Sequence, residues 1–145
     1  MISTVAVGTD GSDTASAAVD AAVELAERFQ ARLVLLSAFK PEAIGAGAAR
    51  LSGALAAYPE WSSNAAEQVE RILATAEERI SERGIECSSA MAEGDPGEVL
   101  VELAEKHGAD VLVVGNKGME RRLLGSVPNT VSHRATCAVL VVKTT

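Results

Sequence analysis

Several kinds of residue are scarce in this chain, and each shortage excludes classes of protein. Aromatic residues make up 3% of the 145 residues, whereas hydrophobic residues make up 48%. The core must therefore be built from Val, Leu, Ile and Ala, which suits a layered α/β protein. A flavin carrier shares such a fold but needs aromatic side chains to stack on the flavin. The length suits one full core and is too short for two, so we expect residues 1–145 to form a single domain.

Positive charge and cysteine are also in short supply. The formal net charge is −7, which argues against a general affinity for nucleic acid or an anionic membrane. Cys87 and Cys137 have no metal-ligand or Cys-x-x-Cys spacing, so we interpret them as buried free thiols in a reducing compartment. No apolar run approaches membrane-spanning length, and no charged-then-apolar leader precedes the first apolar segment. We therefore expect a cytoplasmic protein.

Five short apolar segments alternate with helical patterns along the chain. We predict strands at residues 4–7, 32–38, 85–91, 111–114 and 138–142. Regular alternation of this kind predicts one sheet of parallel strands, joined by right-handed crossovers and covered by helices on both faces. The first helical pattern predicts a buried stripe formed by Ala15, Ala18, Val19, Ala22, Ala26 and Phe29.

Residues 95–108 carry the clearest helix boundaries. Asp95 suits the N-cap, Pro96 suits the first helical position, and Glu98 has capping-box spacing, while Gly108 ends the helix. Residues 40–62 differ, because they hold three glycines, two prolines and the only Trp and Tyr, with weak periodicity. Such a long segment is either a lid over a ligand or an insertion without function, and the sequence leaves both open.

The segment from Val111 to Asn129, VLVVGNKGMERRLLGSVPN, is the most informative part of the chain. Its apolar start indicates a strand buried on both faces, which ends at Gly115. Glycines there let the backbone approach a ligand closely and turn N–H groups outward. Ser126, with Pro128 behind it, indicates a helix start whose free N–H groups and dipole favour an anion. Together these features predict a phosphate cradle and hence a nucleotide-binding protein.

Charged residues accompany the cradle. Lys117, Arg121 and Arg122 are confined to it, which predicts at least one phosphate contact, although solvated charge is the usual fate of such side chains. Asp10 follows the first strand, and ligands of open parallel sheets sit outside the carboxyl ends of the strands. Asp10 either holds a ribose hydroxyl or a magnesium ion, or simply forms an Asp-Gly turn, and both interpretations stay open.

The chain resembles the ATP-binding universal stress proteins over essentially its whole length. The segments VAVGTDGSDTASAAVDAAVELA, EGDPGEVLVELAEKHGADVLVVGNKG and LLGSVPNTVSHRATCAVLVVK carry the resemblance. The family pattern is Gly-x2-Gly-x9-Gly-(Ser/Thr), with an Asp after the first strand. The resemblance implies a Rossmann-like sheet of the adenine nucleotide alpha hydrolase-like type, with strand order 3-2-1-4-5. It also implies a dimeric stress-response or signalling role.

The resemblance further implies a binding site for ATP, with Mg²⁺ held through Asp10. The glycines and the serine of the pattern would hold phosphates and ribose, and residues at the ends of three strands would form the adenine pocket. The candidate binding residues are Gly8, Thr9, Asp10, Ala38, Val114, Gly115, Asn116, Lys117, Gly118, Arg121, Arg122, Gly125, Ser126, Val127 and Pro128.

One departure from the family pattern concerns the loop between Gly118 and Gly125. This chain has six residues there, MERRLL, where the family pattern has nine. The shorter loop affects the geometry of a triphosphate more than the adenosine pocket. Either Arg121 and Arg122 compensate by charge, or the protein prefers AMP or cyclic AMP.

A true enzyme, an ATP hydrolase or nucleotidyl transferase, is the rival interpretation. Hydrolysis needs a base or water-orienting residue beside the γ-phosphate. Asn116, Glu120 and Ser126 offer no persuasive partner for that role, so we assign no catalytic residue and expect slow turnover at most. A phosphoacceptor receiver domain also fits the fold, but its required carboxylate after the third strand has only Glu93 as a candidate.

The last strand predicts a homodimer. In the implied strand order it lies at an edge, and its sequence AVLVV carries no proline or charge to blunt that edge. Antiparallel pairing with a second copy would satisfy its backbone groups and close the assembly. A helix or the segment 40–62 folded over the edge is the alternative.

Overall fold

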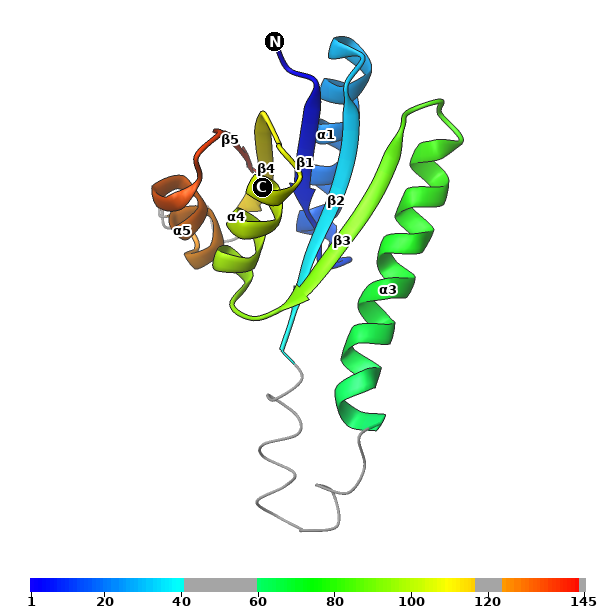
Figure 1. The fold of residues 1–145 in the computed structure, drawn as a ribbon, viewed down its shortest axis with the longest axis vertical. Helices are drawn as coiled ribbons and strands as arrows, with labels where there is room; N and C mark the ends of the chain where they lie inside the picture. The colour runs from blue at the N-terminus through cyan, green and yellow to red at the C-terminus, as the bar shows by residue number, and fades with distance from the viewer. Residues whose placement is uncertain (41–59, 117–123, 144–145) are drawn as a thin grey trace.

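The computed structural model describes residues 1–40, 60–116 and 124–143, with side chains from residue 65 onward in the second range. Strands and helices alternate in it (Figure 1). In chain order they are β1 (Thr4–Gly8), α1 (Asp13–Phe29), β2 (Arg32–Phe39), α3 (Glu60–Ser81), β3 (Cys87–Glu93), α4 (Pro96–Lys106), β4 (Val111–Asn116), α5 (Ser126–Arg134) and β5 (Ala138–Lys143). Among the described helices, none is both long and apolar enough to cross a membrane.

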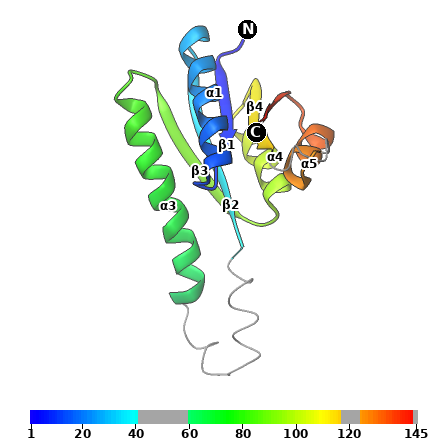
Figure 2. The ribbon, with the colours of Figure 1, turned by 180° about the vertical axis from the view of Figure 1, so that it is seen from behind.

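The strands form one parallel sheet in the order β3-β2-β1-β4-β5. This confirms the predicted α/β class, the parallel sheet and the strand order 3-2-1-4-5. Helices α1 and α3 pack on one face and α4 and α5 on the other, and the view from behind brings α1 in front of the sheet (Figure 2). The order reverses between β1 and β4, so the carboxyl ends of these two strands flank a crevice.

Successive residues of the central strands belong to different layers of the core. Val5 and Val7 face the cluster under α1 and α3, whereas Ala6 between them faces the cluster under α4 and α5. β2 and β4 alternate in the same way, because neighbouring side chains of a strand point to opposite faces. The strands are therefore buried on both faces, which explains their nearly continuous apolar sequences.

β1, β2 and β5 each extend one residue beyond the predicted end, and three elements differ by more. β3 begins at Cys87, two residues later than predicted, although Ile85 before it is buried. β4 runs on through Gly115 to Asn116, because both residues pair with β5. Helix α3 begins at Glu60, inside the segment predicted as a loop, and residues 41–59 of that segment lie outside the described residues.

One residue of the predicted apolar stripe of α1 is not part of the core. Phe29 is 47% exposed, because it is the last residue of the helix and Gln30 then turns the chain in the left-handed conformation, with φ 54°. Val23 is buried in the stripe instead. The stripe therefore follows the sheet beneath it, and the exposed end of the helix extends past the core.

The boundaries of α4 agree with prediction, but Glu98 makes a different contact from the predicted one. Asp95 is the N-cap and accepts a hydrogen bond from the N–H of Glu98 at 3.3 Å, and Gly108 follows the helix with φ +67°. The Glu98 carboxylate, expected to complete a capping box, accepts a hydrogen bond from Arg134 at 2.9 Å. Glu98 thereby connects α4 to the end of α5.

Asp110 makes hydrogen bonds at the amino ends of β1 and β4, at the opposite end of these strands from the crevice. Its Oδ2 accepts hydrogen bonds from the N–H groups of Ser3 and Thr4, each at 2.9 Å. These backbone donors lower the pKa of the Asp110 carboxyl below its ordinary value of 3.8, because they favour the charged form. Asp110 thus joins the start of β1 to the turn before β4.

The lowered pKa predicts how stability responds to acid. Because the folded state holds the carboxylate more strongly than the unfolded chain does, the contribution of Asp110 is complete above pH 3.8 and is lost as the pH falls below that value. Asp110→Asn should therefore be less stable than the wild type at pH 7, and the difference should shrink at pH 3. Urea denaturation at both pH values measures this, with Asp20→Asn, an exposed position on α1, as the control. A difference that stays constant with pH would contradict the prediction.

Candidate functional site

A cavity of about 330 Å³ lies at the carboxyl ends of the strands, at the crevice between β1 and β4. It is lined by residues from the ends of three strands, from the turn after β1 and from the first turns of the helices that follow. The described residues in its lining are Gly8, Thr9, Asp10, Ser12, Thr14, Ala15, Ser37, Ala38, Pro96, Leu100, Val114, Gly115, Gly125, Ser126, Val127 and Pro128. Its position is the one where open parallel sheets bind ligands.

The structure brings together most of the residues singled out from the sequence. Those that line the cavity are Gly8, Thr9, Asp10, Ala38, Val114, Gly115, Gly125, Ser126, Val127 and Pro128. Lys117, Gly118, Arg121 and Arg122 lie outside the described residues. Asn116 is only 1% exposed and does not belong to the described lining. Its side chain lies beneath the site rather than in it.

The candidate binding residues did not include six residues of the lining, which come from the starts of α1 and α4 and from β2 beside the predicted Ala38. These residues are Ser12, Thr14, Ala15, Ser37, Pro96 and Leu100. The N-cap signal of Ser12 could have indicated that the first turn of α1 faces the same crevice as Asp10. No local signal marks Leu100, since it reaches the cavity only through the way in which α4 packs on β2.

Asp10 shapes the turn after β1, as one of the two interpretations of its Asp-Gly sequence predicted. The Asp10 Oδ1 accepts a hydrogen bond from the N–H of Ser12 at 2.9 Å, and Gly11 takes the left-handed conformation with φ +81°. The Ser12 hydroxyl then accepts from the N–H of Ala15 at 3.2 Å as the N-cap of α1. Asp10 nevertheless remains exposed on the cavity wall, so its role in the turn is compatible with a second role toward a ligand.

Gly115 is required by packing as well as by any ligand. A Cβ at this position would lie 2.8 Å from the carbonyl oxygen of Thr14 and 2.9 Å from its Cγ2. Helix α1 therefore sits directly against β4 at this point, and any side chain would push the two apart. The sequence suggested that glycine is needed here so that a phosphate can approach the backbone. The contact with Thr14 adds a structural reason that is independent of a ligand.

Helix α5 opens onto the cavity at its N-terminus, but with a different cap from the expected one. Gly125 is the N-cap and Ser126 is the first residue of the helix, so no side chain caps it. The Gly125 N–H instead donates to Asn116 Oδ1 at 2.8 Å. The next two N–H groups, of Ser126 and Val127, have no partner within the helix, because the first helical hydrogen bond is the one from the Asn129 N–H to the Gly125 carbonyl. Pro128 carries no N–H.

Three helices begin around this cavity. Ser12 is the N-cap of α1, Pro96 opens α4, and Gly125 is the N-cap of α5, and all three residues line the cavity. The partial positive charge at a helix N-terminus favours an anion. The cavity thus combines an apolar part, formed by residues such as Leu100 and Val114, with a wall that favours negative charge.

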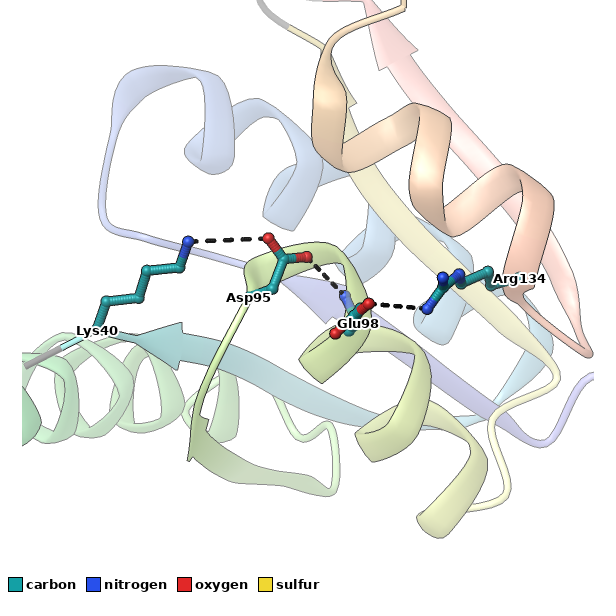
Figure 3. A network of polar contacts seen from close by, with 4 residues as sticks. All are labelled: Lys40, Asp95, Glu98 and Arg134. Atoms are coloured by element: carbon teal, nitrogen blue, oxygen red, sulfur yellow. Dashed lines mark hydrogen bonds and ion pairs between the residues drawn. The ribbon is translucent and has the colours of Figure 1, made fainter. Parts of the chain in front are cut away.

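Ion pairs join α4 to its neighbours beside the cavity. Figure 3 shows Lys40, the residue after β2, paired with Asp95, and Arg134 of α5 paired with Glu98. The Lys40 Nζ lies 3.8 Å from Asp95 Oδ1. All four side chains are about half exposed or more, so each pair contributes little stability. The tighter connection is steric, since a Cβ at Gly97 would lie 2.7 Å from Thr130 Cβ. The wall formed by α4 and α5 is therefore closely packed.

Within the described residues, no three His, Cys, Asp or Glu side chains gather to hold a metal ion. A cation bound at Asp10 would therefore need oxygen ligands from a bound phosphate or from water to complete its coordination. The donor at Asp10 is a hard carboxylate oxygen, which fits Mg²⁺ in that limited sense.

Comparisons with known proteins agree on one family. The universal stress protein family model matches residues 1–143. Universal stress protein Rv1636 from Mycobacterium tuberculosis is 40% identical over 98% of this chain and 97% of its own length. Universal stress protein YxiE from Bacillus subtilis is 31% identical over 99% of this chain and 100% of its own. A universal stress protein solved in complex with cAMP is 35% identical with a TM-score of 0.71, over 99% of this chain and 98% of its own.

Proposed function

Because the chain belongs to the universal stress protein family, we propose that it binds an adenine nucleotide in the 330 Å³ cavity, with ATP as the first candidate. The observation that carries the proposal is the N-terminus of α5, whose Ser126 and Val127 line the cavity beside the ends of β1 and β4. Free N–H groups at a helix start are a phosphate site, and the neighbouring apolar wall suits a base.

The cavity divides into two halves with different chemistry. Ala38, Leu100 and Val114 supply the apolar half, in which we place the adenine. Gly125 and Ser126 supply the half in which we place the phosphates. Asp10 lies on the wall between the strand end and α1, where a carboxylate can accept from a ribose hydroxyl or ligate a Mg²⁺ that a triphosphate brings with it.

Cyclic AMP is the second candidate ligand. The relative solved with cAMP supports it, as does the loop between Gly118 and Gly125, which is three residues shorter than the family pattern. A shorter loop leaves less backbone to surround a triphosphate. AMP has the same adenosine part and one phosphate, so it belongs to the same comparison.

We propose a binding and signalling role in the stress response rather than rapid catalysis. Asp10 is the one ionisable side chain among the described lining residues, and its Oδ1 accepts the hydrogen bond that shapes its own turn. General-base catalysis needs a group positioned to take a proton from water. The proposed unit is residues 1–145 as one nucleotide-binding domain, which turns ATP over slowly at most.

Binding of the unmodified protein tests the proposal directly. Mass spectrometry of nucleotide released on denaturation identifies a ligand that is retained through purification. Calorimetry with ATP, AMP, cyclic AMP and adenosine, with and without Mg²⁺, then ranks the candidates. We expect each nucleotide that binds to exceed adenosine in affinity, because the N–H groups of α5 contact only the phosphate part. Equal affinity for adenosine and all nucleotides would contradict the phosphate site, and no binding of any would contradict the function.

We also propose a homodimer formed through β5. This strand pairs with β4 on one side only and lies at the end of the sheet. Leu140 in its centre is 39% exposed, which is unusual for a leucine in a strand of a parallel sheet. Antiparallel pairing of two β5 strands would cover Leu140 and satisfy the outer backbone groups of both chains.

A further inference from the structure

The side chain of Asn116 is buried and does not line the cavity, so direct contact with a ligand does not explain its position. Asn116 is the last residue of β4 and is 1% exposed, so it is among the few polar residues in the buried core. Its Oδ1 accepts a hydrogen bond from the N–H of Gly125 at 2.8 Å, across nine positions of the sequence. A buried amide needs hydrogen-bond partners, since an unsatisfied polar group in the core destabilises the fold.

This hydrogen bond fixes the start of α5. Gly125 is the N-cap with φ −64° and ψ 170°, and the first helical bond runs from the Asn129 N–H to the Gly125 carbonyl at 3.0 Å. Glycine has no side chain to cap the helix and is the residue that loses most conformational freedom on folding. The Asn116 amide oxygen instead accepts from the N–H of the N-cap residue itself, which is the contact that the Glu or Gln of a capping box makes.

The hydrogen bond to Asn116 determines where the free N–H groups of α5 lie on the cavity wall. Asn116 occupies the first free N–H of the helix, so the next two, on Ser126 and Val127, begin at a defined place on the cavity wall. The acceptor is an amide rather than a carboxylate, so it adds no negative charge beneath a site that must accept phosphate. β4, which is paired with β1 on one side and β5 on the other, thereby sets the position of the anion-binding helix start.

We infer that Asn116 is a positioning residue for phosphate recognition: it aims the N-terminus of α5 at the ligand without touching it. The inference rests on the proposed function and gives one residue a role in it that the sequence pattern did not assign. Adenosine recognition is independent of this contact, because its apolar wall comes from β2, α4 and β4. The structure thus separates phosphate affinity from adenosine affinity at a single side chain.

Asn116→Ala tests this separation. We expect the affinity for ATP to fall about tenfold, the size of effect that one lost hydrogen bond produces, with adenosine affinity unchanged. Asn129→Ala, the same change at an exposed position on α5, is the matched control and should bind both ligands as the wild type does. Calorimetry measures the four affinities. An equal loss for ATP and adenosine, or no loss for either, would overturn the positioning role.

A second measurement keeps the test decisive if the variant folds poorly. In the ligand-free wild type, the amide of Gly125 should exchange with solvent more slowly than the amides of Ser126 and Val127, because only Gly125 is already bonded. Equally fast exchange of all three amides would overturn the inference. If the wild type binds none of the three nucleotides, the proposed function and the positioning role fail together. If Asn116→Ala prefers ATP over adenosine by the same factor as the wild type, only the positioning role fails.

Discussion

Replacing Ser126 with Asp is expected to lower the affinity for ATP by at least about 100-fold, which corresponds to about 2.7 kcal/mol. Ser126 is the first residue of α5, exposed at the cavity wall, and its backbone N–H is one of the two left for a phosphate. A carboxylate there repels phosphate and competes for the same donors. Two charge-assisted hydrogen bonds contribute about 1.5–3 kcal/mol each, so losing both accounts for the expected effect.

The same substitution should not destabilise the fold, and this makes the experiment sharp. An acidic residue in the first turn stabilises a helix by about 0.3–1 kcal/mol through the dipole. The thermal midpoint of Ser126→Asp should therefore equal or exceed that of the wild type, and a loss of binding then reports on the site. Ser126→Ala keeps the N–H and should lose less than about tenfold. Ser132→Asp repeats the charge change at an exposed position on the same helix and should bind normally.

Calorimetry with ATP and adenosine reads out this series. Adenosine should bind all four proteins alike, because it carries no phosphate. If Ser126→Asp binds ATP with wild-type affinity, the helix N-terminus does not hold the phosphates and the nucleotide must be placed elsewhere.

The second large effect concerns assembly: Leu140→Lys is expected to convert a dimer into a monomer. Leu140 lies in β5, at the end of the sheet, and is 39% exposed in the single chain. In an antiparallel pair related by a two-fold axis, residues near the centre of one strand face the same region of the other. Two introduced lysines would then repel each other and lose solvation, and lysine on an edge strand is a known deterrent to pairing.

Light scattering at micromolar concentration measures the outcome. Thr136→Lys, exposed in the turn before β5, gives the same charge change away from the edge and should remain dimeric. Because Leu140 is already partly exposed, Leu140→Lys should not destabilise the single chain. Its thermal midpoint should fall only by the amount that dimerisation contributes to the wild type. A wild type that is monomeric at this concentration would refute the dimer, whatever the variants do.

The sheet could be predicted because its three inner strands, β1, β2 and β4, are buried on both faces. Leu33 to Leu36 and Val111 to Val114 form unbroken apolar runs, since each side chain enters one of two core layers. The alternation with helices then restricts the chain to a parallel sheet. The strand order itself came from the family resemblance, because local patterns do not say which strand lies beside which.

The errors arose where distant contacts override local preference. Ser126 is a better N-cap than Gly125 on intrinsic preference, yet Gly125 is the N-cap, and its N–H donates to the distant Asn116. The assignment of Gly115 to ligand approach stays a prediction, but the sequence did not indicate its second reason for being glycine, the close contact with the backbone of Thr14. Leu100 entered the site through the packing of α4. None of these contacts leaves a periodic or compositional signal in the sequence.

The lining of the cavity comes from β1, β2 and β4 and from the starts of α1, α4 and α5, so elements from both faces of the sheet must be in place before the site exists. A molecule that fills it binds the native state and has no counterpart in the unfolded chain. Bound ligand therefore stabilises the folded state. At a free ligand concentration 100 times the dissociation constant, the free energy of unfolding rises by about 2.7 kcal/mol. The lifetime of the protein and its exposure to proteases would follow the supply of its ligand.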